Sequence, residues 1–300
     1  MPPTFAEIAE LWLNDVRRTR RQKTADNYRN ALNQLYRVLP DLNSRPITRA
    51  DLLKFRDWRA DQVSILTANR DVKALKACLA WAEMNELEHP RVPLKRLLLP
   101  PPPRKDETLT QDEIARLFEA AALDRPCLVI LKIAHGTGFR LGEILNLWWR
   151  DVDVSEGAIS VTAKPDWRPK TDAALRTVFA PELARWLGHY REALRYRADD
   201  DRVCQQNEVK GTAWSPTSQR VSVRLRRVYE NAGIHGKKPT HSLRHTMASD
   251  LVQSGAPIHV AQKHLGHSSA AVTLGVYAHA QKRGLRRAGE VLEAYRRGDD

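Results

Sequence analysis

Four consecutive prolines at positions 100–103 divide the chain into two parts that are expected to fold separately. Each proline fixes its own φ and lacks an amide donor, so the run excludes helix and favours extended polyproline geometry. Such a segment acts as a semi-rigid spacer. A chain of 300 residues is long enough for two domains that each bury a core. We therefore predict one domain over residues 1–96, a linker over 97–107 and a second domain over 108–300.

The first part has the pattern of four helices. Thr4 and Glu7 form a capping box ahead of apolar residues at helical spacing, and Thr48 begins another such segment. Two further helices are predicted, one beginning at Thr24 and one over residues 67–86. The first domain is therefore predicted to be a small four-helix unit.

The second part is predicted to be mostly helical with one small sheet. Strand character is confined to residues 158–163 and 175–180, which could pair as an antiparallel hairpin. Helical patterns cover the rest: 127–134, 181–197, 217–232, 240–253, 257–265, a short helix holding Tyr277 and a tail helix within 280–298. The fold class is therefore mainly α, of the α+β type.

Basic residues exceed acidic residues in both parts. Lys and Arg outnumber Asp and Glu by 18 to 12 over residues 1–103 and by 31 to 24 in the remainder, which gives a formal net charge of +13. A chain that is basic throughout is suited to contact a polyanion along both domains. This balance favours a nucleic acid as the partner, although many other soluble proteins are basic too.

Cysteine usage and hydropathy favour a cytoplasmic protein without a membrane partner. The three cysteines, Cys78, Cys127 and Cys204, are far apart and show no C-x-x-C spacing, which argues against a disulfide framework or a cysteine zinc site. No apolar run approaches the roughly 18 residues of a membrane span, and acidic residues occupy the region where a signal peptide is positive and apolar.

Groups able to act on a phosphodiester recur in short motifs of the second part. In chain order these are TG-x-R-x-x-E at 137–143 with Arg140, H-x-x-R at 241–244 with His241 and Arg244, LGH at 265–267 with His267, and Tyr277, which precedes His279 by two residues. Arginines keep their charge and present a planar fork to phosphate oxygens. A phenol beside such cations is equipped to attack phosphorus. Each residue alone would also fit a structural role, but the joint pattern favours a role in catalysis on a phosphodiester.

In order, spacing and flanking residues, these motifs resemble those of the tyrosine recombinase (phage integrase) family over roughly residues 108–280. The resemblance implies an N-terminal SAM-like core-binding domain and a catalytic domain with a small antiparallel sheet, which together form a C-shaped clamp on DNA. It also implies a site-specific recombinase that breaks and rejoins double-stranded DNA, needs no cofactor or metal, and works as a homo-tetramer on DNA. The sequence does not indicate accessory DNA-bending proteins.

The resemblance also implies roles for individual residues. Tyr277 would attack the phosphodiester and form a 3′-phosphotyrosine ester, and Arg140 and Arg244 would hold the non-bridging oxygens. His241 would handle the phenolic or leaving-group proton, and His267 would hydrogen-bond the scissile phosphate. Phe139, where an aliphatic residue is commoner in the family, and Ser242, where an acid is frequent, depart from the pattern without removing a reacting group.

A lysine on the hairpin would protonate the leaving 5′-oxygen in this family. Lys170 is the preferred candidate, because Lys170 and Arg176 fit the family's K-T…R-x-V run, and Lys164 is the alternative. Candidate DNA contacts in the first domain are Lys23, Thr24, Arg70 and Lys73.

Other functions remain open at this point. A type IB topoisomerase would share the attack but reseal the original strand, and a regulator with this fold would bind DNA without cutting it. Zinc binding by the histidines between 235 and 279 is a third alternative, although their spacing fits no common zinc pattern and no cysteine lies nearby. The target DNA sequence and the biological setting of the reaction cannot be read from the chain.

Overall fold

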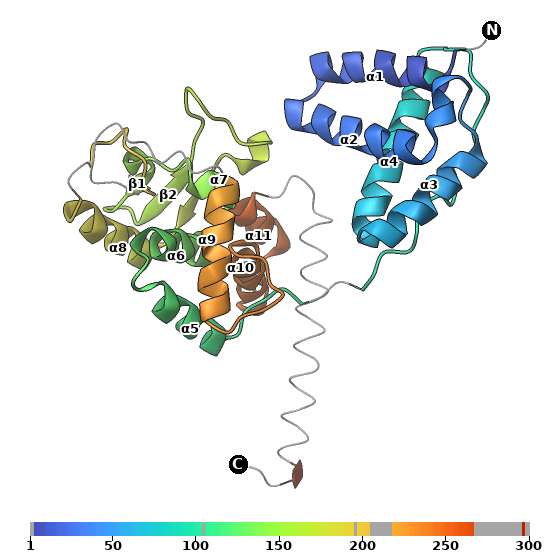
Figure 1. Cartoon of the computed structure of the whole chain (residues 1–300). Coiled ribbons are helices and arrows are strands. Elements are labelled where there is room, and N and C mark those ends of the chain that lie inside the picture. Colours follow the sequence, from blue (N-terminus) through green and yellow to red (C-terminus); the bar gives the residue numbers. More distant parts are fainter. Residues whose placement is uncertain (1–2, 104–105, 195–196, 205–217, 267–295, 298–300) are drawn as a thin grey trace. The chain divides into compact units, whose positions relative to one another are not determined.

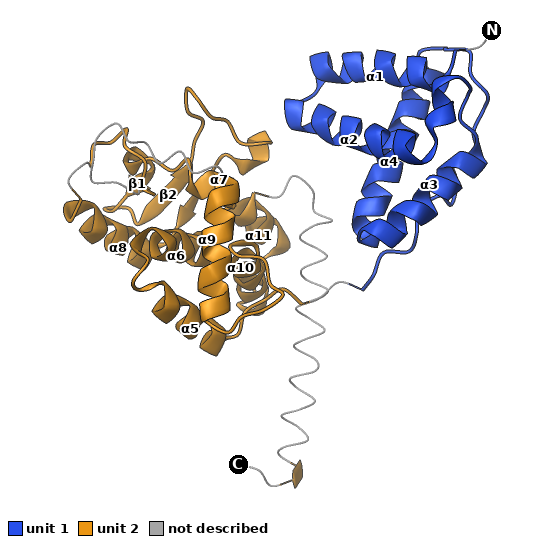
Figure 2. Ribbon diagram, in the orientation of Figure 1, with its two compact units in different colours: residues 1–105 blue, residues 106–300 orange. Residues whose placement is uncertain are grey.

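The chain consists of two compact units, residues 1–105 and 106–300, which are described separately (Figure 2). The computed structural model describes residues 3–103, 106–194, 197–204, 218–266 and 296–297. Within these residues, no helix is both long enough and apolar enough to cross a membrane.

Unit 1 contains the predicted helices (Figure 1). They are α1 (Phe5–Thr19), α2 (Gln22–Val38), α3 (Arg49–Gln62) and α4 (Ile65–Met84), with a short 3-10 helix, η1, over Pro40–Asn43. The capping boxes at Thr4 and Thr48 are both formed. Helices α2 and α4 begin two residues earlier than the sequence indicated. The side chain of Ser64 caps α4, whereas Arg21, at the N-cap of α2, makes no side-chain cap hydrogen bond.

The core of unit 1 gathers around α4, which packs against α1, α2 and α3. Large apolar side chains such as those of Phe5, Leu35, Phe55 and Leu75 are fully buried there. Burial of each such side chain contributes roughly 1.5–3 kcal/mol to folding. The four-helix prediction for the first domain is therefore confirmed.

The beginning of the proline-rich segment is fixed to unit 1. Leu97 is 1% exposed and belongs to the core of this unit. The side-chain amide of Asn69, on α4, donates to the carbonyl of Leu99 (2.8 Å) and accepts from its N–H (2.9 Å). This part of the expected linker therefore packs on the first unit.

Unit 2 is built around α6 (Arg125–Thr137), which packs against α5 (Gln111–Ala121), the one-turn α7 (Leu141–Ile144) and three later helices. Those are α8 (Pro181–Glu192), α9 (Ser218–Asn231) and α10 (His241–Gln253); α11 (Ile258–Leu265) packs on α10. Apolar residues cover most of α6, which explains its central position. Helix α8 ends five residues before the predicted end, and the predicted helices around Tyr277 and over 280–298 lie almost entirely outside the described residues.

The sheet of unit 2 is antiparallel with strand order β1-β2-β3. The strands are β1 (Val152–Asp153), β2 (Ala158–Val161) and β3 (Arg176–Phe179), and η2 (Trp149–Asp151) precedes them. In the register, Ser160 faces Thr177. The predicted hairpin is confirmed with shorter strands, and the loop between β2 and β3, which contains η3 (Asp172–Ala174), carries both candidate lysines.

Candidate active site

A glycine turn joins the central helix to the first candidate arginine. Gly138 ends α6 with φ +66°, a backbone conformation that side chains disfavour. A Cβ at this position would lie 3.1 Å from Leu265 and 3.2 Å from Met247, so the close approach of α10 and α11 also favours glycine. The turn directs Arg140 to the start of α7.

Arg140 is held on one side and exposed on the other. Its Nη1 donates to Glu143 Oε1 (2.8 Å) and its Nη2 donates to the carbonyl of Gly266 (3.2 Å). The side chain is nevertheless 44% exposed. Because guanidinium carries five N–H donors, some remain able to bind a ligand.

Arg244, on α10, is buried, and its guanidinium points to the C-terminal end of α11, which Arg140 also binds. Its Nη1 donates to the carbonyl of Gly138 and its Nη2 donates to the carbonyl of Leu265. Leu265 and Gly266 are consecutive, so the two arginines, separated by more than a hundred residues in the sequence, both bind the C-terminal end of α11. The structure thus brings together two of the predicted site residues.

Glu143 and Arg176 connect Arg140 to the C-terminal end of α11. Glu143 Oε2 accepts from Arg176 Nη2 (3.0 Å), and both side chains are almost fully buried. Arg176 also donates to the carbonyl of His264 (2.6 Å) and stacks on the ring of Phe139 at 4.6 Å. The aromatic residue at position 139 therefore has a structural role, and Glu143 positions Arg140.

The arginine cluster carries excess positive charge. Arg140 and Arg176 both form ion pairs with Glu143, and the charge of the same carboxylate also acts on Arg244. Burial, together with the charges of Arg140 and Arg176, lowers the pKa of Arg244 to about 9, so the group remains charged at neutral pH. Burial raises the pKa of Glu143, but Arg176 and the hydrogen bonds from Arg140 lower it overall. A bound anion would offset this excess charge, since oppositely charged groups stabilise each other in a desolvated site.

A cleft of about 570 Å³ opens beside these arginines. It is lined by Arg140, Leu141, Ser222, Leu225, Arg226, Lys238, Pro239, Thr240, His241 and Arg244. Arg226 and Lys238 were not among the predicted site residues, although both are basic residues that precede the H-x-x-R motif in the sequence. The cleft thus presents several cations and one imidazole to a ligand.

His241 is the first residue of α10, and its side chain is 53% exposed. The preceding residue, Thr240, has φ +57°, an uncommon conformation for a residue with a side chain. Burial lowers the pKa of His241, the Glu107 carboxylate opposes this effect, and Lys238 and nearby arginines add to it. With a pKa below its ordinary value, His241 is neutral at pH 7 and able to accept a proton.

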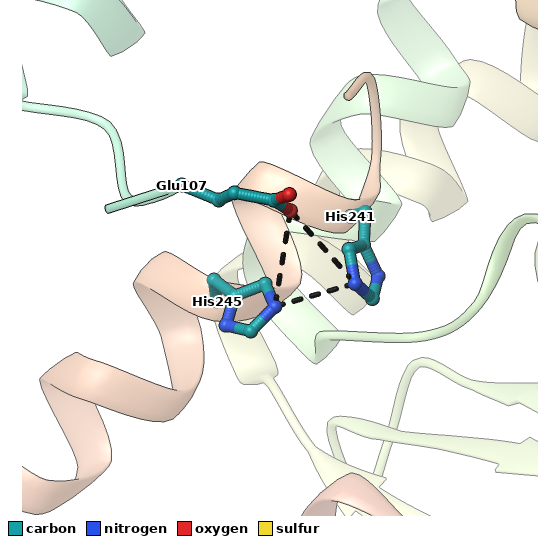
Figure 3. Close-up of side chains that lie close together, drawn as sticks. All are labelled: Glu107, His241 and His245. Carbon is teal, nitrogen blue, oxygen red and sulfur yellow. Dashed lines mark hydrogen bonds and ion pairs between the residues drawn. The ribbon is translucent and has the colours of Figure 1, made fainter. Parts of the chain in front are cut away.

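His245 and Glu107 lie beside His241 (Figure 3). The Nε2 atoms of the two histidines are 3.3 Å apart, and each lies 3.9 Å from Glu107 Oε2. Neither His245 nor Glu107 was among the site residues predicted from the sequence. Contact between residues so distant in sequence has no signal in a single chain.

The two candidate lysines differ in environment. Lys164 has a side chain that is 1% exposed, and its Nζ donates to both carboxylate oxygens of Asp151, at 2.6 and 2.7 Å. Lys170 is exposed. Lys164 is therefore committed to a buried ion pair, whereas Lys170 lies on the surface of the loop.

The remaining candidates are two residues of unit 2 and four residues of unit 1. His267 and Tyr277 are outside the described residues. In unit 1, Lys23 and Thr24 belong to α2, and Arg70 and Lys73 belong to α4. Their side chains are exposed apart from the half-buried Thr24, and Arg70 pairs with Asp71 at 3.0 Å.

Comparison with protein families covers both units. Residues 107–283, more than half of the chain, match the phage integrase family. Residues 9–86 match the phage integrase N-terminal SAM-like domain.

Individual proteins similar to this chain bear related names. Tyrosine recombinase XerD of Ralstonia nicotianae is 25% identical over 298 residues, covering 95% of this chain and 94% of its own. Tyrosine recombinase XerA of Pyrococcus furiosus is 29% identical, with coverage of 81% and 80%. Among solved structures, XerH recombinase bound to difH DNA has a TM-score of 0.69 at 20% identity, covering 92% of this chain and 82% of its own. A lambda integrase tetramer on a Holliday junction has a TM-score of 0.69 at 20% identity, with coverage of 91% and 77%. Both structures share the fold of this chain.

Proposed function

Because the chain belongs to the phage integrase family, we infer that it is a site-specific DNA recombinase and propose that Tyr277 is its nucleophile. The observation that carries the assignment of the site is the convergence of Arg140 and Arg244 on the end of α11, beside a cleft that His241 also lines. Arg140, Arg244 and His241 are proposed to act on one phosphate.

The excess positive charge fits the proposed chemistry. Attack at phosphorus places negative charge on the non-bridging oxygens of a five-coordinate transition state, and fixed cations stabilise that state most when they are already in place. Arg244 is locked by two backbone carbonyls, and Arg140 by Glu143 and Gly266. These contacts hold both guanidinium groups before substrate binds, which lowers the cost of reorganisation.

The groups near the site suggest how the phenolic proton would be removed. A phenol with a pKa near 10 must lose its proton to attack at neutral pH. His241, neutral at pH 7, is proposed to take part in this proton transfer. His267 is bonded directly to Gly266, whose carbonyl Arg140 binds, which supports its proposed hydrogen bond to the scissile phosphate.

The reaction conserves the energy of the broken bond. Attack by Tyr277 on phosphorus forms a 3′-phosphotyrosine ester and releases a 5′-hydroxyl. A 5′-hydroxyl from a second duplex then attacks the ester, restores the phenol and joins the new strand without ATP. Because the named relatives and structures are recombinases and integrases, strand exchange is favoured over simple relaxation.

The assembly on DNA is proposed from the same comparisons. We infer a homo-tetramer on two duplexes, by analogy with the lambda integrase tetramer on a Holliday junction. Lys23, Thr24, Arg70 and Lys73 are proposed to contact backbone phosphates through unit 1, with a salt dependence that follows the number of phosphates neutralised. The reaction is proposed to take place in the cytoplasm.

Sequencing DNA that is covalently trapped on the protein in cells tests this function. The proposal expects a small set of related sites, and expects that a plasmid carrying two copies of such a site is recombined by the purified protein. Adducts scattered without a shared sequence, together with relaxation of supercoiled plasmid and no exchanged product, would support the topoisomerase alternative instead.

Lys170 is proposed to protonate the leaving oxygen, because it fits the K-T…R-x-V run and is exposed, whereas the side chain of Lys164 is buried. Lys170→Ala is expected to slow cleavage about 10²–10⁴-fold, the usual contribution of a general acid. A substrate with a 5′-bridging sulfur should restore the rate, since a thiolate leaves without a proton. The measurement is single-turnover cleavage of both substrates.

The matched control for Lys170→Ala is Arg168→Ala, which removes another cation of the same loop that pairs with Asp172. This variant should cleave the ordinary substrate at nearly the normal rate. A Lys170→Ala enzyme that remains equally slow on the sulfur substrate would show that Lys170 is not the general acid.

A further inference from the structure

Glu107, His241 and His245 form a cluster of metal-ligating atoms (Figure 3), and His241 of this cluster also lines the cleft. The donor atoms, one from each residue, all lie within 4.8 Å of one another. Imidazole nitrogen and carboxylate oxygen are both ordinary ligands of Zn²⁺, and two histidines with one glutamate form a known donor set. The spacing of four residues between the histidines places both on one face of α10.

The distances match tetrahedral coordination. Zn–N bonds of about 2.0–2.1 Å at the tetrahedral angle separate two ligand atoms by about 3.3–3.4 Å. The two Nε2 atoms are 3.3 Å apart. Glu107 Oε2 lies 3.9 Å from each nitrogen, so its carboxylate would approach by about 0.5 Å to complete the same geometry.

The three ligands are held by independent contacts. The histidines are fixed by their helix, and the segment of Glu107 is tied to that helix through the N–H of Leu109, which donates to Thr246 Oγ1 at 2.8 Å. Lys237 Nζ donates to the carbonyl of Thr108 at 2.8 Å. Glu107 is therefore presented to the histidines by the fold of unit 2.

The carboxylate of Glu107 has an unsatisfied oxygen. Among the described residues, the buried Oε2 atom has no hydrogen-bond partner, and 3.9 Å is too long for a hydrogen bond to either imidazole. Lys238 lies 3.5 Å from the other oxygen, Oε1, and its side chain is 75% exposed, so it can turn away from a bound cation. A metal ion between the three residues would satisfy Oε2.

We propose that Glu107, His241 and His245 bind Zn²⁺ and that the bound ion inhibits DNA cleavage. The inhibitory part rests on the proposed function, because coordination would occupy the His241 Nε2 lone pair and remove the group from proton transfer. The positive charge of the ion would not take over the proton transfer that His241 is proposed to perform.

Binding is tested by titrating the full-length protein with zinc chloride in a calorimeter and by recording the visible spectrum with Co²⁺. One ion per chain is expected at this site, and Glu107→Gln and His245→Asn should each weaken binding at least about tenfold. His189→Ala, which removes an exposed histidine on α8, should bind Zn²⁺ as the wild type does. Equal affinity in the wild type, Glu107→Gln and His245→Asn would overturn the site.

Inhibition is measured separately, as the ratio of cleavage rates with and without Zn²⁺ for each variant. Saturating Zn²⁺ should lower cleavage by the wild type at least tenfold, a chelator should restore it, and His245→Asn should be inhibited only at correspondingly higher concentrations. Binding without inhibition would overturn the inhibitory role and leave the site standing. If no condition yields cleavage, the proposed function fails, while the calorimetry still decides the metal site.

Discussion

The Tyr277→Phe variant is expected to form no covalent adduct with DNA and to lose at least about 10⁴-fold in cleavage rate, because it lacks the attacking oxygen. Its affinity for DNA, measured by gel shift, should change little, since only the hydroxyl is removed. Adduct formation on a nicked duplex, followed on a denaturing gel, measures the effect.

The other tyrosines of unit 2 make poor alternatives or serve as controls. Burial raises the pKa of Tyr190 and of Tyr229 to about 12, which makes either phenolate harder to form than that of an exposed tyrosine. Tyr196 and Tyr295 lie outside the described residues. Tyr295→Phe is the closest control by position, and it should still form the adduct. Persistence of the adduct in Tyr277→Phe, with its loss in Tyr295→Phe, would reassign the nucleophile.

The second large effect is expected from Arg244→Lys. A lysine keeps the charge but is a point donor, so it cannot bind the Gly138 and Leu265 carbonyls and a phosphate with the geometry of a guanidinium. Loss of one such stabilising group typically lowers the rate about 10²–10³-fold. Single-turnover cleavage at saturating protein isolates this effect from DNA binding.

Folding must be separated from catalysis in this experiment, because Arg244 is buried. Thermal unfolding of Arg244→Lys should therefore be measured beside its cleavage rate. The matched control is Arg224→Lys, an arginine of α9 that pairs with Asp124 and does not line the cleft. A folded Arg244→Lys enzyme that cleaves within a few-fold of the wild type would show that this guanidinium does not stabilise the transition state.

Local signals in the sequence predicted the elements of the fold well. The capping residues Thr4 and Thr48 mark real helix starts, because the side chains that satisfy the free N–H groups of a helix can be recognised in the sequence. The ends of the elements were predicted less well, since α8 stops at Glu192, before the predicted end at 197. Strand β1 was not predicted, because two residues are too few to show an alternating pattern of apolar and polar residues. Its existence depends on pairing with β2, which is a tertiary contact.

The candidate site also combines residues that the sequence predicted with contacts that it did not predict. The sequence motifs identified Arg140, Arg244 and His241 as site residues. They did not predict the contacts that hold the two arginines, because these contacts are made to backbone carbonyls, which every residue has. The burial of Lys164 against Asp151 separates the two lysines only once the fold is known. The proximity of Glu107 to the histidines depends equally on the fold.

The most direct test of the account is to identify the amino acid that is joined to DNA. The wild-type protein is incubated with a nicked duplex carrying the site captured in cells, the adduct is digested with protease and nuclease, and the modified peptide is sequenced by mass spectrometry. The account predicts a phosphodiester remnant on Tyr277 with a free 5′-hydroxyl on the released strand. A remnant on any other residue, or a 5′-linked adduct, would contradict it.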